Sequence, residues 1–383
     1  MKRSSERILT THAGSLPRPP GLVDSLLQEG SRAFESAEGA ARLREAVVEI
    51  VRKQVTIGID VVSDGEYGKP SFVAYVNERL GGIAVDNEAP PRISWLDSRE
   101  GRSFPEFYAS GSGVHPFPRM SCVAPLTYVG DAQLKRDIEN FKAALKGSPA
   151  TEAFMPAISP ANVEDWLWNA YYKTQEEYLF AIADALHKEY RAIVDAGLLL
   201  QIDDPRLITY WIRQPNISLA ECRKWAQMRV SALNHALRGI PREKIRFHTC
   251  YGINMGPRVH DMELKDVVDL ILQINAGGFS FEAANPRHEH EWKVWESAKL
   301  PEGAVLIPGV ISHTTVLVEH PELVAQRIER FARVVGRENV IAGTDCGFAT
   351  FAGSKEVHPS IVLAKFESLI AGARTASTRL WDA

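Results

Sequence analysis

The chain has 383 residues, of which 45% are hydrophobic and 24% charged, and its formal net charge is -4 at pH 7. This composition is typical of a globular protein with a large core, and it excludes a fibre, a disordered tail and a disulfide scaffold. The mild acidity, without long runs of Lys and Arg, argues against nucleic acid or anionic lipid as the main partner. We therefore expect a small-molecule ligand.

Targeting signals are not evident in the sequence. The N-terminal stretch MKRSSERILTTHAGSLPRPP lacks the apolar core of a signal peptide, and no segment offers the roughly 18 consecutive apolar residues of a membrane span. This predicts a cytoplasmic protein that does not associate with a membrane. The four cysteines would then be reduced, which favours metal binding or catalysis over a disulfide.

Short β-type runs alternate with longer segments whose apolar residues recur every three or four positions. Residues 176–197 and 320–336 have this second pattern and end at glycine, as amphipathic helices do. Eight strands alternating with helices predict a single (β/α)8 TIM barrel that spans residues 1–383 as one domain. The eight predicted strands are 8–14, 60–66, 153–159, 198–203, 245–251, 279–284, 305–312 and 340–347.

Residues 81–150 interrupt the alternation. This stretch is rich in Pro, Gly and aromatic residues, and it includes PRISWLDSREGRSFPEFY and CVAPLTYVGD. Long irregular loops in compact domains are usually functional or disordered. We interpret the stretch as an enlarged βα insertion with a hairpin that covers the barrel mouth.

Metal-ligating residue types gather at the ends of three predicted strands. His248 and Cys250 are two positions apart, so an extended chain points both side chains to the same face. Glu282 and Cys346 end two further strands, and the C-terminal ends of barrel strands meet at one rim. One histidine, one glutamate and two cysteines form an acceptable zinc set, and the thiolates disfavour magnesium and calcium. The alternative is that each of these residues is an ordinary core or rim residue.

A cysteine-rich zinc site favours one kind of chemistry. Hydrolytic zinc sites usually keep three protein ligands and an open position for water. Zinc can instead hold a substrate thiol as the thiolate, which is the form that attacks carbon. If Glu282 is an exchangeable ligand that leaves as the substrate sulfur arrives, the site would transfer an alkyl group to sulfur.

Several motifs together resemble a known family. THAGSLPRP, GIDVVSDGE, LQIDDP, HTCYG, FEAANPR, PGVISHTT and GTDCGF are similar to the catalytic barrel of cobalamin-independent methionine synthase and its shorter relatives, which include epoxyalkane:coenzyme M transferase. The resemblance extends from about residue 8 to residue 370. It implies that His248, Cys250, Glu282 and Cys346 bind Zn²⁺, and that the chain methylates a small-molecule thiol, homocysteine first among them.

The resemblance also implies roles for five further residues. Gly14 and Ser15 match contacts to the carboxylate of the amino-acid substrate, while Glu66 and Asp203 match the acidic residues that hold its ammonium group. His313 stands where the family places a histidine that relays a proton to the departing methyl donor, although the local sequence reads ISHT instead of IHS. The structural alternatives are a helix cap for Ser15, a rim hydrogen bond for Asp203 and a solvated loop for His313.

The sequence leaves the methyl donor and the oligomeric state open. Full-length synthases have two barrels, whereas this chain has length for one, so a methylfolate, a methylated corrinoid protein or another methylated molecule could be the donor. Trp166, Trp168, Tyr171 and Tyr172 could stack on a flat donor or belong to the core. Two other functions stay open: a thiol alkyltransferase or demethylase acting on an epoxide, methoxy- or methylthio-compound, and a non-catalytic zinc-binding barrel.

Overall fold

A mostly parallel sheet forms the centre of the computed structural model, which describes residues 1–90, 94–109, 118–252, 256–354 and 357–382. Its eight strands lie in the order β1-β11-β10-β9-β8-β7-β5-β2, and every pairing between neighbours is parallel. The strands are β1 (Leu9–Thr10), β2 (Val61–Val62), β5 (Glu152–Ile158), β7 (Leu199–Asp203), β8 (Ile245–Thr249), β9 (Gly278–Phe281), β10 (Val305–Ile311) and β11 (Ile341–Thr344).

The two ends of this sheet meet, so the sheet is nearly closed. The backbone N–H of Asp60 donates to the carbonyl of Thr10 at 3.2 Å, and the Thr11 hydroxyl donates to the carbonyl of Val61 at 3.0 Å. These bonds place β1 beside β2. All eight strands coincide with the predicted runs, and the predicted α/β barrel class is confirmed.

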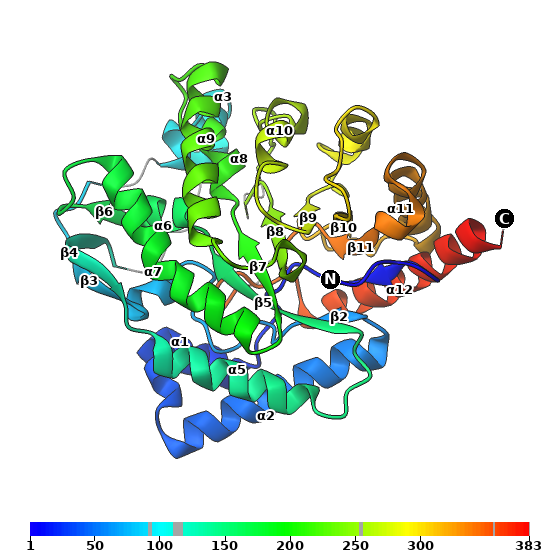
Figure 1. Cartoon of the computed structure of the whole chain (residues 1–383), viewed down its shortest axis with the longest axis horizontal. Helices are drawn as coiled ribbons and strands as arrows, with labels where there is room; N and C mark the ends of the chain where they lie inside the picture. Colours follow the sequence, from blue (N-terminus) through cyan, green and yellow to red (C-terminus); the bar gives the residue numbers. More distant parts are fainter. Residues whose placement is uncertain (91–93, 110–117, 253–255, 355–356, 383) are drawn as a thin grey trace.

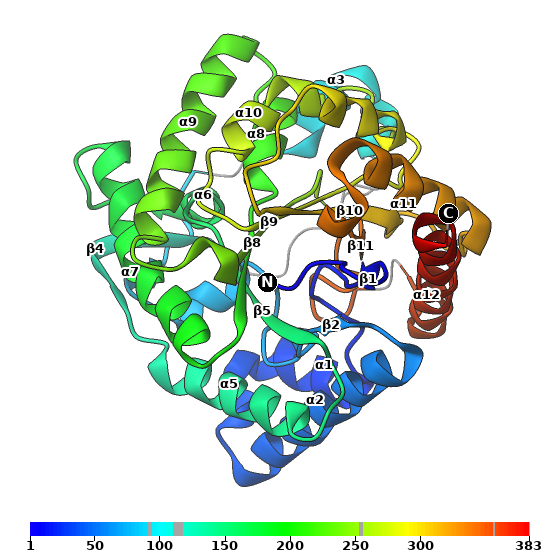
Figure 2. The same cartoon turned by 45° about the vertical axis from the view of Figure 1, so that its right-hand side comes forward.

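Helices surround the sheet as an outer ring (Figures 1 and 2). The segment predicted at 176–197 is α7, in which Thr174 caps the first turn by accepting from the N–H of Glu177. The segment predicted at 320–336 is α11, which ends at Gly336. The described α-helices are α1 (Pro20–Glu29), α2 (Ala37–Ile57), α3 (Arg99–Ser103), α4 (Pro105–Ala109), α5 (Asp131–Leu145), α6 (Pro160–Trp166), α7 (Gln175–Asp195), α8 (Arg206–Arg213), α9 (Leu219–Ala236), α10 (Val268–Ile271), α11 (Pro321–Val335) and α12 (Pro359–Trp381).

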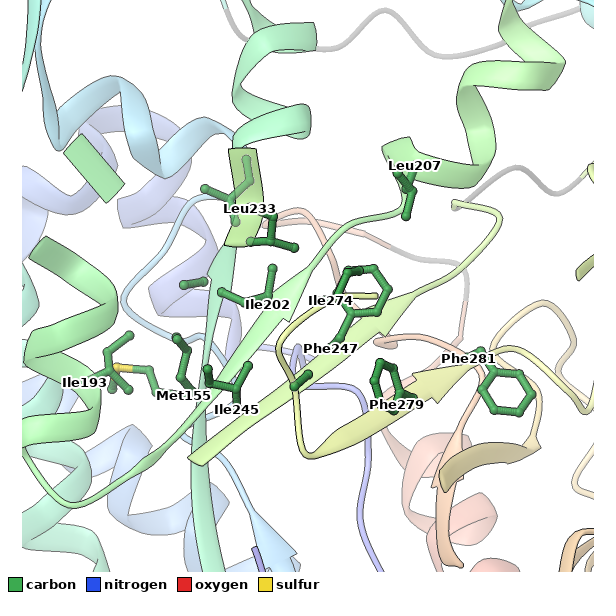
Figure 3. Close-up of a cluster of buried hydrophobic side chains, with 14 of the residues drawn as sticks. Met155, Ile193, Ile202, Leu207, Leu233, Ile245, Phe247, Ile274, Phe279 and Phe281 are labelled. Atoms are coloured by element: carbon green, nitrogen blue, oxygen red, sulfur yellow. The ribbon is translucent and has the colours of Figure 1, made fainter. Parts of the chain in front are cut away.

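The main core lies between the sheet and this ring. Figure 3 shows Ile245 and Phe247 of β8 packed among apolar side chains of neighbouring strands and helices. The alternate residue Arg246 faces the barrel interior, where it donates to the Thr11 hydroxyl and the His12 carbonyl, both at 3.0 Å. Because side chains alternate along a strand, the interior face of β8 continues to His248. The strand period therefore directs the imidazole into the barrel.

The inserted region differs in part from the prediction. β3 (Leu80–Val85) and β4 (Met120–Tyr128) do form an antiparallel hairpin, and β6 (Leu167–Asn169) extends it to three strands. The hairpin does not cover the mouth, because it packs beside α7, where the Tyr128 hydroxyl donates to Glu189 at 2.8 Å. The insertion also ends before α5, which joins the outer ring beside α2. Residues 91–93 and 110–117 lie outside the described part of the chain.

No helix in the described part of the chain has both the length and the apolar character that crossing a bilayer requires.

Candidate metal and substrate site

Three of the four predicted metal ligands converge. The ligand atoms of His248, Cys250 and Cys346 all lie within 4.8 Å of one another, and the two Sγ atoms are 3.3 Å apart. His248 and Cys250 come from the end of β8, and Cys346 follows β11 on the other side of β9 and β10. The closing of the barrel therefore brings together residues that are 96 positions apart in sequence.

The cluster suits a thiophilic cation. His248 Nδ1 lies 3.0 Å from the Ser280 hydroxyl, while its Nε2 is buried with no hydrogen-bond partner among the described residues. Burial, reinforced by Arg246, lowers the pKa of His248 to about 3, so the imidazole is neutral and can act as a ligand. The hydrogen bond to Cys250 and burial raise the pKa of the Cys346 thiol well above its usual value. One nitrogen and two sulfurs fit zinc, which stabilises the thiolate form.

Glu282 is held by other partners. Its carboxylate accepts from the N–H of Tyr251 at 2.8 Å and from the Arg258 guanidinium at 3.0 Å, and it also accepts from Asn285. A carboxylate oxygen of Glu282 lies within 4.8 Å of ligand atoms of His313 and Asp345. Glu282 does not belong to the group formed by His248, Cys250 and Cys346. Although burial alone would raise its pKa, Arg258 and other neighbours lower the pKa of Glu282, so it is a carboxylate. As a metal ligand it would have to leave Arg258.

His313 follows β10 and is buried beside Glu282 and Asp345. Both ring nitrogens are buried and have no hydrogen-bond partner of normal geometry among the described residues. Burial lowers the pKa of His313 to about 4, so the ring is neutral at pH 7. Asp345 accepts from the N–H groups of Ala283 and Ala284, both at 2.8 Å, and burial raises its pKa to about 7. The alternative of a solvated loop position for His313 is therefore wrong, because its side chain is buried.

The loops that follow β1 and β2 are closely packed. Gly14 has a φ of +122°, and a Cβ at this position would lie 2.8 Å from Pro156 Cγ and 3.3 Å from Glu66 Oε1. Glu66 itself has a φ of +59°, which a residue other than glycine adopts only where its surroundings impose it. The Ser15 carbonyl accepts from the N–H of Phe348 at 2.9 Å, which joins this loop to the one that carries Cys346.

Glu66 and Asp203 form an acidic pair at the same end of the barrel. Lys69 Nζ lies 3.3 Å from Glu66 Oε2 and donates to the Pro156 carbonyl at 2.6 Å. Asp203 accepts from Gln201 at 2.7 Å. Burial, and then the charge of Glu66, raise the pKa of Asp203 well above its ordinary value. Although Lys69 and Arg246 act in the opposite direction, the pKa of Asp203 stays raised, so a further cation such as a substrate amino group would stabilise its carboxylate.

One cleft joins the cluster to the acidic pair. Ser15, Glu66, Asp203, His248, Cys250 and Cys346 all line it, whereas Gly14, Glu282 and His313 are not among its lining residues. Trp95 of the insertion also lines the cleft, so part of the insertion does reach the barrel mouth. Two features were not anticipated from sequence: Lys69, which is three residues after Glu66, and the arginines of α8, Arg206 and Arg213. Nothing in the spacing of these residues marks them.

Comparison with known proteins places the chain in a family. Residues 8–110 and 122–365 match the family model described as "Cobalamin-independent synthase, Catalytic domain". The chain belongs to this family. Methionine synthase of Saccharolobus islandicus (strain L.S.2.15 / Lassen #1) is 26% identical over 372 residues, which are 97% of this chain and 95% of the relative. Methionine synthase of Sulfolobus acidocaldarius is 26% identical over 339 residues, which are 88% of this chain and 85% of the relative.

Solved structures of similar proteins support the same fold. A B12-independent methionine synthase from Shewanella sp. W3-18-1, in complex with selenomethionine, has a TM-score of 0.72 at 21% identity and covers 98% of this chain and 100% of its own. A putative vitamin-B12 independent methionine synthase from Listeria monocytogenes has a TM-score of 0.66 at 19% identity, covering 96% and 98%. The resemblance inferred from the motifs is thereby confirmed for the family and for the barrel.

Proposed function

We propose that this protein is a zinc-dependent methyltransferase that transfers a methyl group to the sulfur of homocysteine, which yields methionine. The observation that carries the proposal is the shared cleft, in which a His-Cys-Cys cluster lies at one position and a buried acidic pair at another. Homocysteine has a thiol and an amino group, so one molecule can meet both. The names of the relatives, which are methionine synthases, support the same substrate.

Each part of the cleft would have its own task. His248, Cys250 and Cys346 would hold the metal. Bound zinc would supply a positive charge that keeps a thiol deprotonated, and therefore nucleophilic, at neutral pH. Glu66 and Asp203 would bind the substrate ammonium group, while the Gly14–Ser15 turn would bind its carboxylate. These contacts would fix the direction in which the sulfur faces the methyl donor.

Glu282 and His313 would act from behind the lining of the cleft. We propose Glu282 as an exchangeable fourth ligand, because its present bonds to Arg258 and Tyr251 give it an alternative position when substrate sulfur binds. His313 would pass a proton to the leaving group of the donor, since neither of its ring nitrogens has a hydrogen-bond partner of normal geometry among the described residues. That transfer requires a water molecule or a side-chain movement to bridge from His313 to the cleft.

The donor is a methylfolate, a methylated corrinoid protein or another methylated small molecule. A second function keeps the metal and the thiol but takes an epoxide, methoxy- or methylthio-compound as the electrophile. The buried pair of Glu66 and Asp203 favours the first function, because a thiol that lacks an amino group would bring no further cation to these carboxyl groups.

The test is direct detection of methionine. Zinc-loaded protein is incubated with homocysteine and, in separate reactions, methyltetrahydrofolate or methylcobalamin, and the products are measured by mass spectrometry. Methionine that forms with either donor and disappears in Cys250→Ser supports the proposal. If neither donor gives methionine while homocysteine still changes the absorption of the cobalt-substituted protein, the thiol chemistry stands and the second function is favoured. An unchanged cobalt spectrum would contradict both and favour a non-catalytic barrel.

A further inference from the structure

Two arginines of α8 lie where the cleft meets a second pocket. Arg206 and Arg213 are seven residues apart, which is about two helical turns, so they lie on the same side of the helix. Both line the cleft that contains the metal cluster, and both also line the adjoining pocket with Arg119 and Trp168. Asp165 of α6 lies between them, 3.0 Å from Arg206 and 3.6 Å from Arg213. The arginines therefore form a wall shared by the two spaces.

The wall is built around two guanidinium groups. Asp165 is a single carboxylate for two guanidinium groups. The other acidic residue that lines the second pocket, Glu164, is paired with Arg229 through Nε at 2.9 Å and Nη2 at 2.5 Å. Glu164 is thus neutralised from outside both pockets. The wall therefore brings two guanidinium groups to the boundary of the two pockets.

A buried donor group at the wall also lacks an acceptor. Arg206 is more than nine-tenths buried, and its Nη1 has no hydrogen-bond partner among the described residues. A buried polar group left without a partner is costly, and more so when it is charged. A guanidinium presents its N–H groups in a planar fork that matches a carboxylate or a phosphate. The geometry thus calls for an anion at Arg206.

The surroundings would strengthen such a contact. Trp95 and Trp166 line the cleft beside the arginines, and the Arg213 guanidinium lies 5.7 Å from the centre of the Trp95 ring. Apolar aromatic walls exclude water, and ionic attraction is stronger where the effective dielectric constant is lower. A ligand that joins an anionic group to an apolar or planar portion would match both the guanidinium groups and the aromatic walls of the cleft.

We propose that Arg206 and Arg213 form an anion-binding subsite for the carboxylate or phosphate group of the molecule that delivers the methyl group. The assignment to the donor rests on the proposed function, in which the charged groups of homocysteine are met by Glu66, Asp203 and the Gly14–Ser15 turn. Arg206 and Arg213 are therefore available to bind the second substrate, the methyl donor. The subsite thereby selects donors that carry a negative charge.

The test measures anion binding without turnover. Zinc-loaded protein, free of both substrates, is titrated with glutarate as a carboxylate probe and with inorganic phosphate, and tryptophan fluorescence reports binding at the cleft. We expect a saturable change with at least one probe, and the probe that binds more tightly identifies the type of anion. Arg206→Gln and Arg213→Gln should weaken binding at least tenfold, whereas Asp165→Asn, which removes the competing carboxylate, should strengthen it severalfold.

Two controls separate this result from general charge or folding effects. Arg42→Gln removes an equal charge from an exposed position of α2 and should leave anion binding unchanged. Asp165→Asn tests the opposite direction, so a variant that merely unfolds cannot imitate the expected pattern. The proposal is overturned if neither anion binds to the unmodified protein, or if binding is the same in Arg206→Gln. The anion titration involves no reaction, so its outcome is independent of whether the protein forms methionine.

Discussion

At the scale of single residues, the candidate site includes two histidines whose pKa values are lowered by burial. His248 and His313 are neutral because charged imidazole is disfavoured away from water, and the pKa values of both are lowered to about 3 and 4. The Cys346 thiol donates a hydrogen bond to Cys250 Sγ at 3.3 Å. Cysteine binds a cation as the thiolate, so metal binding to this cluster releases protons.

The metal ligands can be ranked by substitution. Cys346→Ser is expected to weaken zinc affinity about 100-fold or more, since a zinc-binding free energy of about 10 to 16 kcal/mol shared among four ligands gives roughly 3 kcal/mol for each. Glu282→Gln should weaken it less than about tenfold, because the carboxylate is shared with Arg258. The zinc affinities of both variants can be measured by competition with a chromophoric chelator. Cys122→Ser is the matched control, a buried cysteine outside the cleft, and equal losses in all three variants would contradict the ranking.

The acidic pair predicts a change in substrate affinity. Asp203→Asn should raise the KM for homocysteine about 10- to 100-fold, the effect of losing one charged hydrogen bond to an ammonium group, with little change in kcat. Steady-state kinetics at a saturating concentration of the methyl donor would measure it. Asp195→Asn, an exposed change on α7, should leave both constants unaltered. An unchanged KM in Asp203→Asn would remove this residue from substrate binding.

At the scale of elements, a buried ionic network joins the inserted hairpin to the barrel. Arg79, immediately before β3, lies 2.6 Å from Asp137 of α5 and 3.3 Å from Glu189 of α7. Although burial opposes its charge, the two carboxylates raise the pKa of Arg79. Tyr75 and Tyr128 also donate to Glu189, at 2.9 and 2.8 Å. The network fixes the hairpin against the side of the barrel and away from the mouth.

Breaking this network should destabilise the protein strongly. Arg79→Met leaves the buried Glu189 carboxylate without its cation and Asp137 with Arg136 alone, and we expect a loss of about 3 to 5 kcal/mol in the free energy of unfolding. Urea denaturation followed by circular dichroism would measure it. Arg52→Met, which breaks an exposed pair on α2, should change the free energy by less than about 1 kcal/mol. Similar values for the two variants would show that the buried network is not what anchors the hairpin.

At the scale of the whole molecule, the loops after β8 and β9 are joined by a second buried network that links stability to pH. His288 stacks on Tyr251 with ring centres 3.6 Å apart, and its nitrogens lie 3.2 Å from Asp261 and 2.9 Å from Glu291. Burial alone would lower its pKa, but the hydrogen bonds to the two carboxylates outweigh burial and raise the pKa of His288 to about 9. The imidazolium is therefore the form that belongs to the folded state at neutral pH.

This shift sets the sign of a pH dependence. The folded pKa of His288 lies above the unfolded value of about 6.5, so its contribution is complete below pH 6.5 and is lost as the pH rises through 9. The free energy of unfolding of the unmodified protein should exceed that of His288→Gln by about 3 kcal/mol at pH 6, and the difference should shrink above pH 9. Denaturant titrations of both proteins across this range would measure it. A difference that grows toward alkaline pH would contradict the network.

The sequence by itself determined the features that depend on local pattern. Short β-type runs between longer amphipathic segments located every strand of the barrel, because side chains repeat every two residues along a strand and about every 3.6 residues along a helix. The spacing of His248 and Cys250 gave their common direction for the same reason. The family motifs, which are short runs at strand ends, led to the correct fold and family.

Only the tertiary structure decided which groups share a site. The contact of Cys250 with Cys346, the bond between Glu282 and Arg258, the pairing of Glu66 with Lys69 and the arginine wall of α8 depend on how distant loops pack. The predicted position of the hairpin over the barrel mouth is wrong, because the strand pattern does not encode the buried ion pair of Arg79 and Glu189 that holds the hairpin against α7. Hydrogen bonds and ion pairs between loops act over a few ångströms and have no period in the sequence, so they exist only once the barrel has closed.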